Sequence, residues 1–376
     1  TGTMQGIINQ QGELRALAKI PTSCQMSLLR YGLDGSLLLA AGRDGRIHRW
    51  RLPPVGLPLP AADAKSPDAG ESAELPPLVG HNGWISSLEI SADGQWLLSA
   101  DTWGRLACWP LTATAERPHW EHAEAHAGWL RALAVTRDGS CLASCGADGM
   151  VRLWNPADGS LLRQFSGGGQ DLYSLACHPD GQRLAVGDLR GGIHVFDLRD
   201  GKHLTTWDAA EFYKLSYIQE VGGVRWVAWN GNGTVLAAAG CIPENGGFVQ
   251  GIPALRFFNT ADGSVLQQLK LGDNQEGFVH QVLWHPEDYW MGVCSGQPGR
   301  GRFFLHRTAD EAPFCLNPQP LANCHSAALH PLGRQVAVLA NEGTYGQQKS
   351  MAKDGIYPGN TSPIHVFELP ASGPVS

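Results

Sequence analysis

One histidine, one serine and one aspartate in a short stretch of the chain have the residue types of a hydrolytic triad. These residues are His126, Ser144 and Asp148. In such a triad the histidine removes the proton of the serine hydroxyl while the acidic side chain orients the imidazole. The same constellation recurs on unrelated folds, so residue types alone do not separate a catalytic set from a structural one. The secondary structure elements that carry the three residues are therefore needed to distinguish a catalytic role from a structural one.

Metal and phosphate chemistry have weaker support in the sequence. His119, His122 and His126 form the one histidine cluster with spacing close to that of zinc ligands. Their segment lacks a helical pattern that would align the first two, so we expect no metal site. The glycine runs 167–169 and 296–301 lack the Lys-Ser/Thr of a phosphate-binding loop. The sequence therefore predicts no metal and no cofactor.

Length, charge and cysteine usage narrow the class of protein. A chain of 376 residues is long for one ordinary core, which favours a repeat architecture. The net charge of -7 and the absence of clustered Lys and Arg argue against nucleic acid as a partner. Nine cysteines without a Cys-x-x-Cys pair indicate reduced thiols in a cytoplasmic protein. No apolar run approaches 18 residues and no signal peptide is visible at the start, so we expect no membrane association.

The chain repeats one unit, in which β-rich runs are separated by glycine-containing turns and the last run ends in an aromatic residue. Glycine supplies positive φ in such turns, and aspartate caps them through its backbone. The seven turns that mark the units are Asp34-Gly35, Asp93-Gly94, Asp138-Gly139, Asp180-Gly181, Asn232-Gly233, Glu287-Asp288 and Leu332-Gly333.

One unit carries a family resemblance. Residues 126–155, which open with His126 and close with Trp154-Asn155, resemble a WD40 repeat throughout. The resemblance extends over roughly residues 10–370, strongly in units one to four and loosely in units five to seven. It implies an all-β fold, a seven-bladed WD40-like β-propeller in which neighbouring blades cover the apolar faces of each sheet.

The whole chain is expected to form this single domain. The segment 13–20 is expected to supply the outer strand of the last blade and to close the ring. The predicted blades span approximately 23–80, 81–125, 126–166, 167–208, 222–272, 277–320 and 323–369.

The resemblance also changes the interpretation of the apparent triad. In WD40 blades a loop histidine, a serine, a turn aspartate and a tryptophan form a structural hydrogen-bonded set, which here maps to His126, Ser144, Asp148 and Trp154. Other units are expected to keep only part of it. Unit two has Trp103 where Asp148 aligns, and unit one has Asp44 without the loop histidine. We therefore predict no catalytic residues.

Binding is expected on the face formed by the turns between the second and third strands and by the connections between blades. Long insertions on this face are expected at 241–254, 295–301 and 341–362 in units five to seven and at 208–222 before unit five, and loops on a rigid scaffold often bind partners. The alternative is that these loops only cover the channel. A further insertion, from Pro53 to Pro77 in unit one, falls on the opposite face and is expected to be a solvated loop. For Trp84 and Trp129, at the channel entrance, a structural role is favoured over a binding role. The candidate binding residues are Trp84, Trp129, Phe212, Tyr213, Tyr217, Phe248, Tyr345, Lys349, Lys353 and Tyr357.

These observations favour a non-catalytic protein- or peptide-binding scaffold, a subunit of a larger assembly whose propeller is itself monomeric. The expected partner is a protein or peptide, not nucleic acid or a membrane. The alternative is an enzyme or a small-ligand-binding propeller that uses the axial channel, since fold does not settle function.

Overall fold

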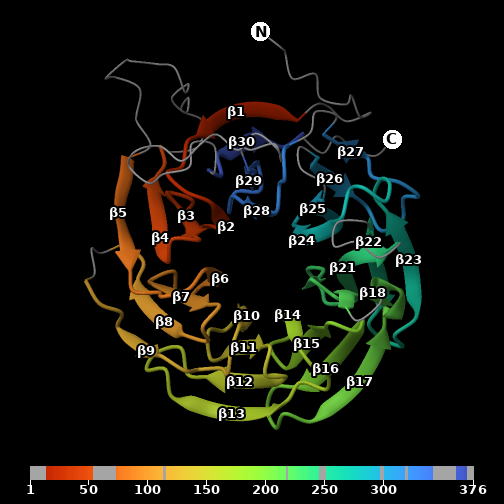
Figure 1. Cartoon of the computed structure of the whole chain (residues 1–376), viewed down its shortest axis with the longest axis horizontal. Helices are drawn as coiled ribbons and strands as arrows, with labels where there is room; N and C mark the ends of the chain where they lie inside the picture. Colours follow the sequence, from red (N-terminus) through yellow and green to blue (C-terminus); the bar gives the residue numbers. More distant parts are fainter. Residues whose placement is uncertain are drawn as a thin grey trace.

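The computed structural model describes residues 14–53, 73–112, 116–216, 219–244, 251–296, 300–317, 321–341 and 361–370. Seven four-stranded antiparallel sheets are arranged radially around a central axis (Figure 1). The chain is thus an all-β, seven-bladed propeller, as predicted. Within each blade the strands follow one another outward from the axis, and the first strand of each blade lines the centre of the ring.

The strands of the first three blades follow one another in the order of the sequence. Blade one contains β2 (Met26–Tyr31), β3 (Leu37–Gly42), β4 (Arg46–Arg51) and β5 (Ala73–Val79). Blade two contains β6 (Ile85–Ile90), β7 (Trp96–Asp101), β8 (Leu106–Pro110) and β9 (Trp120–His122). Blade three contains β10 (Leu130–Val135), β11 (Leu142–Gly146), β12 (Met150–Trp154) and β13 (Leu161–Ser166).

The next three blades are built in the same way. Blade four contains β14 (Leu172–Cys177), β15 (Arg183–Asp188), β16 (Gly192–Asp197) and β17 (His203–Asp208). Blade five contains β20 (Trp226–Trp229), β21 (Val235–Pro243), β22 (Gly251–Asn259) and β23 (Val265–Lys270). Blade six contains β24 (Phe278–His285), β25 (Tyr289–Ser295), β26 (Arg302–His306) and β27 (Cys315–Leu316).

Blade seven combines the two ends of the described chain. It contains β28 (Ser326–Leu329), β29 (Gln335–Leu339) and β30 (Ile364–Glu368), and its outermost strand is β1 (Arg15–Ile20). β1 runs antiparallel to β30, with Arg15 opposite Glu368 and Ile20 opposite Ile364 (Figure 1). Backbone hydrogen bonds between the N-terminal and C-terminal strands therefore close the ring.

The core consists of apolar clusters that lie between blades. In the described residues there are seven clusters, and each combines side chains from two adjacent blades. Between blades seven and one, for example, Ile364 and Val366 pack with Met26, Leu29 and Leu38, all buried. Each sheet is thus covered by its two neighbours, which is why radial packing satisfies apolar faces on both sides.

The predicted turns connect the first and second strands. Gly35 adopts φ 74°, and the carboxylate of Asp34 accepts a hydrogen bond from the Ser36 N–H at 2.9 Å. Blade six has no glycine here, and Asp288 itself adopts φ 66°. Aspartate tolerates this left-handed conformation better than most residues do.

Two segments differ from the sequence-based expectation. The predicted insertion between Pro53 and Pro77 ends earlier, because β5 begins at Ala73 and contains two prolines. As the outermost strand of its blade, β5 has one edge that needs no N–H donors. In blade five, residues 241–254 were expected to be a loop, but β21 continues to Pro243 and β22 starts at Gly251.

The long connection into blade five is also more ordered than predicted. It contains a 3-10 turn, η1 (Ala210–Phe212), followed by an additional hairpin of β18 (Tyr213–Ser216) and β19 (Gln219–Gly222).

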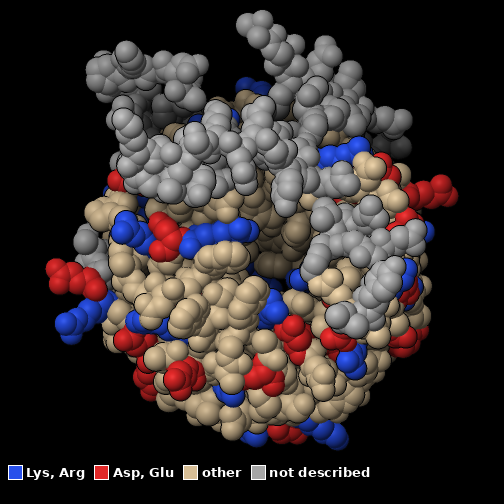
Figure 2. Space-filling view, viewed as in Figure 1, with Lys and Arg blue, Asp and Glu red and all other residues tan. Residues whose placement is uncertain are grey.

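Because successive strands of a blade are antiparallel, the turns after the second strand and the connections between blades emerge at the same end. We call this end the top face. Figure 2 shows a face of the ring with the central opening. Among the described residues, no helix has the length and apolar character needed to cross a bilayer.

Candidate functional site

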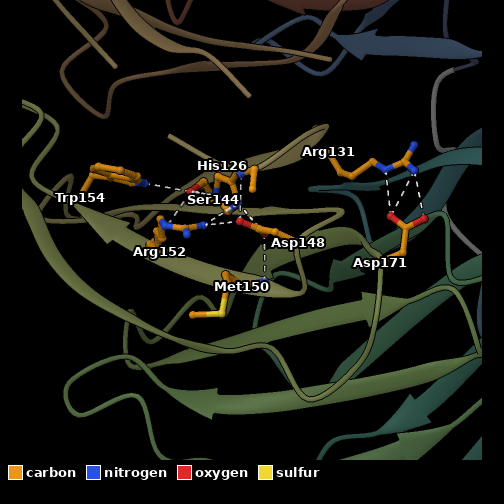
Figure 3. Close-up of polar contacts among 9 residues, drawn as sticks. His126, Arg131, Ser144, Asp148, Met150, Arg152, Trp154 and Asp171 are labelled. Carbon is orange, nitrogen blue, oxygen red and sulfur yellow. Dashed lines mark hydrogen bonds and ion pairs between the residues drawn. The ribbon is translucent and has the colours of Figure 1, made fainter. Parts of the chain in front are cut away.

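The triad-like residues of blade three form a closed, buried network (Figure 3). His126 Nδ1 lies 2.9 Å from Asp148, and His126 Nε2 lies 2.8 Å from the Ser144 hydroxyl. Trp154 donates its indole N–H to the same hydroxyl at 2.8 Å. A neutral imidazole satisfies the set, donating from Nδ1 and accepting the serine proton at Nε2. All four residues that the resemblance assigned to a structural set are therefore joined.

A substrate could not reach the serine and histidine of this network, because both side chains are buried. Ser144 has no exposed surface and His126 is 2% exposed. Burial lowers the pKa of His126, while burial of Asp148 is outweighed by hydrogen bonds from His126 and Arg152, which hold the pKa of Asp148 at about 2. The set is a neutral imidazole beside a fixed carboxylate, and it links the turn between β11 and β12 to the connection before β10.

Blade two has the complete set, contrary to the prediction that it keeps only part. His81 lies 2.8 Å from Asp101 and 2.6 Å from the Ser99 hydroxyl, which accepts the Trp109 N–H at 2.9 Å. The carboxylate comes from Asp101, two positions before the Trp103 that aligns with Asp148. Alignment by position missed it because the acid projects from the end of β7 rather than from the turn.

In blades one and four the imidazole comes from the third strand, whereas in blades two and three it comes from the connection before the first strand. In blade one, which lacks the loop histidine, His48 on β4 lies 3.1 Å from Asp44. In blade four, His194 on β16 lies 2.9 Å from Asp188. Unit one thus lacks the loop histidine, as expected, and His48 reaches Asp44 from the third strand of the blade instead.

The three histidines considered as metal ligands each have another partner. His119 stacks on Trp96 with ring centroids 4.5 Å apart, and His122 Nε2 lies 2.6 Å from the Gly159 carbonyl oxygen. His126 belongs to the blade-three network. Among the described residues, the group with metal-like geometry is instead Cys24, Asp44 and His48. Sequence spacing gave no signal for it, because the three residues come from a connection, a turn and a strand.

Trp84 and Trp129 are exposed on the top face, immediately before the first strands of blades two and three. Their exposed fractions are 48% and 44%. The guanidinium of Arg43 lies over Trp84 at 4.7 Å from the ring centroid, and that of Arg131 lies over Trp129 at 4.3 Å. Such contacts hold the guanidinium and indole as flat, ordered surfaces.

The stacking continues across blades three to six at the entrance of the axial channel. Arg131 also lies over Tyr173, and Arg225 lies over both Tyr173 and Phe278 at 4.4 and 4.9 Å. We call the five residues Trp129, Arg131, Tyr173, Arg225 and Phe278 the channel-mouth series. Each stands at or next to the start of an innermost strand, so the ring geometry places them side by side.

The two arginines of the series differ in their charge partners. Arg131 forms an ion pair with Asp171, with two contacts of 3.1 Å from one guanidinium nitrogen (Figure 3). Arg225 has no carboxylate partner in the described part of the chain, and its Nε is buried without a hydrogen-bond acceptor. Arg225 is thus a positive charge available to an incoming anion.

Below the mouth, a cavity of about 930 Å³ occupies the channel. Arg131, Tyr173, Arg225 and His280 contribute to its wall. Figure 2 shows basic side chains at the rim of the central opening.

The remaining predicted binding residues fall into two groups. Phe212 is fully buried against Val224 and Phe258, so its prediction as a surface contact was wrong. Tyr213 is half-buried, and its hydroxyl donates to Glu220 at 2.9 Å. Six candidates lie outside the described residues: Tyr217, Phe248, Tyr345, Lys349, Lys353 and Tyr357.

A ring of seven four-stranded blades around an open channel defines the protein as a seven-bladed β-propeller. The family described as WD domain, G-beta repeat matches residues 74–109, 121–155 and 159–197. Each match contains the outer strand of one blade and the first three strands of the next, as in β5 to β8. In these three stretches, which cover blades two to four, the chain matches the WD40 repeat, as the sequence resemblance implied.

The chain is similar to several known proteins over part of their length. The chain is 30% identical to Protein groucho of Drosophila melanogaster over 36% of this chain and 19% of that protein. It is 30% identical to SIR4-interacting protein SIF2 of Saccharomyces cerevisiae over 32% of this chain and 22% of that protein. It is 31% identical to Telomerase protein component 1 of Rattus norvegicus over 54% of this chain and 7% of that protein. The matches thus span less than a quarter of each relative.

Proposed function

We propose that the chain is a non-catalytic protein-binding scaffold, a subunit of a larger assembly, that holds an acidic segment of its partner at the channel mouth. The observation that carries the proposal is the pair of exposed tryptophans, Trp84 and Trp129, each stacked by an arginine. Tryptophan, tyrosine and arginine are the residues that contribute most to protein interfaces. The yeast relative is named for its interaction with another protein.

The charges at the mouth favour an acidic partner. Arg43 donates to the amide oxygen of Gln25 at 3.0 Å, and Arg225 lies between two aromatic rings. Neither has a carboxylate partner among the described residues. Glutamate or aspartate side chains of the partner would accept charge-assisted hydrogen bonds from these two guanidinium groups.

The top-face loops of blades five to seven would extend this surface. Their insertions start after Glu244, Gly296 and Asn341, and they include the predicted binding residues Phe248, Tyr345 and Tyr357. In this proposal the channel mouth fixes the acidic segment, and the loops contact the rest of the partner.

The buried state of the triad-like sets supports a non-catalytic role. The hydroxyls of Ser99 and Ser144 have no exposed surface, and each already accepts a tryptophan N–H. A serine nucleophile must reach its substrate, so these sets serve the fold. All nine cysteines are free thiols, which supports a reducing compartment such as the cytoplasm.

The proposal is tested with a fluorescein-labelled octapeptide of glutamate, followed by fluorescence anisotropy at low ionic strength. We expect the Arg225→Gln variant to bind about tenfold more weakly, which corresponds to about 1.4 kcal/mol. Arg163→Gln is the matched control, because Arg163 is exposed on the outer strand β13 and its substitution removes the same charge.

Two results would contradict this function. Octaglutamate could bind no better than octaserine, or Arg225→Gln and Arg163→Gln could weaken binding equally. Equal weakening would indicate a diffuse charge effect rather than a site.

The channel cavity supports a second candidate function, a small-ligand site. Its volume of about 930 Å³ lies within the usual range of ligand pockets, about 300 to 1,000 Å³. A small molecule that binds in the channel and is unaffected by Trp84→Ala would favour this function over peptide binding.

A further inference from the structure

Three donor atoms of different chemistry meet at the top of blade one. Cys24 Sγ lies 3.8 Å from His48 Nε2, and the same nitrogen lies 3.1 Å from Asp44 Oδ2. All three atoms lie within 4.8 Å of one another. We propose that Cys24, Asp44 and His48 bind a zinc ion, a site distinct from the channel mouth.

The separations match those of ligands around one ion. With Zn–S of about 2.3 Å and Zn–N of about 2.1 Å, a tetrahedral angle places the sulfur and nitrogen about 3.6 Å apart. The observed distance is 3.8 Å. The same construction places nitrogen and carboxylate oxygen about 3.3 Å apart, compared with the observed 3.1 Å. Only small side-chain shifts are needed to accommodate the ion.

The donor set selects the metal. Thiolate, imidazole and carboxylate are zinc ligands, whereas magnesium and calcium require oxygen donors. On binding, the thiol of Cys24 forms a sulfur–zinc bond and releases its proton to solvent. The fourth position is left for water. Asp44 is exposed, which gives an ion access to the otherwise buried His48.

A second carboxylate orients the imidazole. Glu74 Oε1 lies 3.9 Å from His48 Nδ1, on the side of the ring away from Cys24. A carboxylate near this nitrogen favours the tautomer with its proton at Nδ1, which leaves Nε2 free to ligate.

Comparison with other blades shows what is special to blade one. Blade four has a similar aspartate–histidine pair in Asp188 and His194, but among the described residues no cysteine joins it in a metal-like group. Two residues before the first strand, where blade one has Cys24, blades two and three have Gly83 and Gly128. The aspartate–histidine pair is therefore an ordinary feature of these blades, and the thiol is the additional ligand.

The site lies at the seam where the ring closes. Cys24 belongs to the connection between β1 of blade seven and β2 of blade one, and its carbonyl oxygen accepts the Ser362 N–H at 3.2 Å. Ser362 lies two residues before β30, and its hydroxyl accepts the Met26 N–H at 2.9 Å. A zinc ion would tie this connection to the β3–β4 turn and to β4, and so stabilise the closed ring.

The experiment is a cobalt titration of the full chain after chelator treatment, under anaerobic conditions with a phosphine reductant. Cobalt(II) reports a thiolate ligand through a near-ultraviolet charge-transfer band and tetrahedral geometry through strong visible bands. We expect one equivalent to bind, both features to appear, and zinc to displace them. Cys24→Ser should remove the charge-transfer band and weaken zinc binding at least about tenfold.

Matched variants separate this site from incidental binding. Cys141→Ser alters another partly buried thiol, and His194→Gln alters the corresponding pair of blade four, so both should keep the band. Asp44→Asn, at an exposed position, should weaken binding while the far-ultraviolet spectrum stays unchanged. The absence of a charge-transfer band in the folded wild-type chain, or a band that persists in Cys24→Ser, would overturn the proposal.

Discussion

The imidazole of His330 in blade seven fills the space that a side chain at Gly35 in blade one would need. A Cβ atom at Gly35 would lie 2.0 Å from His330 Nε2. His178 and Gly233 repeat this relationship between blades four and five, where His178 Nε2 lies 3.0 Å from the Gly233 carbonyl oxygen. A histidine that follows the first strand of one blade thus contacts the corresponding turn of the next blade.

Gly35→Ala should therefore destabilise the ring more than a turn substitution ordinarily does. The alanine would have to adopt φ near 74° and would displace His330 from its hydrogen bond to Gly35. Gly181→Ala is the matched control, with φ 71° and no atom within 4 Å of a new Cβ. Urea denaturation should show an additional loss of about 1–3 kcal/mol for Gly35→Ala. Equal losses in the two variants would show that the His330 contact contributes nothing.

His126→Ala should lower the stability of the fold without unfolding it. The substitution leaves the Asp148 carboxylate and the Ser144 hydroxyl without their imidazole partner in a buried site. The expected loss is about 1–3 kcal/mol by chemical denaturation. His203→Ala, at an exposed position, should change stability little. A His126→Ala variant as stable as the wild type would contradict the structural role of the set.

Removal of residues 1–20 should lower the melting temperature by several degrees. The deletion removes β1 with its hydrogen bonds to β30, and it removes Ile20 from the cluster between blades seven and one. Removal of residues 1–13 alone keeps the whole of β1 and should leave the melting temperature close to that of the full chain. Differential scanning calorimetry distinguishes the two deletions, and equal melting temperatures would mean that β1 is dispensable.

Stability should decrease as the pH falls from 7 to 5. Burial lowers the pKa of His280 to about 3 and also lowers the pKa values of His126 and His330. In the unfolded chain these imidazoles take up protons near pH 6.5. Below that pH the unfolded state binds more protons than the folded state, so acid favours unfolding. The contribution is complete above pH 6.5 and declines as the pH falls toward the folded values.

Thermal melts at pH 7 and pH 5 measure this effect. His280→Asn should reduce the change in melting temperature between the two pH values, whereas His203→Asn should not. A wild-type melting temperature that rises on acidification would contradict the assigned direction.

The blade pattern could be predicted because it depends on local signals. Each Asp-Gly turn marks a hairpin through backbone geometry that glycine alone adopts without strain, as at Gly139 with φ 71°. The closing aromatic, such as Trp154, marks a buried position in the third strand. Both signals act within a few residues, so one chain is enough to detect them.

The site could not be predicted to the same extent, because it depends on contacts between distant segments. Phe212 lies in a long connection, but its ring packs against Gly240, where a Cβ would approach it to 2.9 Å. Asp101 replaces the expected turn acid because its strand end faces His81. Cys24 and His48 meet only once the chain has folded into a blade. The stacking of Arg225 between Tyr173 and Phe278 likewise joins three blades.

In the described part of the chain, every apolar cluster lies between two blades, and this placement determines how the protein is expected to unfold. A fragment that contained only some of the blades would expose to water, at each of its two ends, the apolar side chains that pack against the missing neighbour. No single blade can therefore be expected to persist alone, and opening one junction deprives both adjoining sheets of cover. We expect the whole propeller to unfold in one cooperative transition. The stability of the pairing between β1 and β30 should determine how readily unfolding starts.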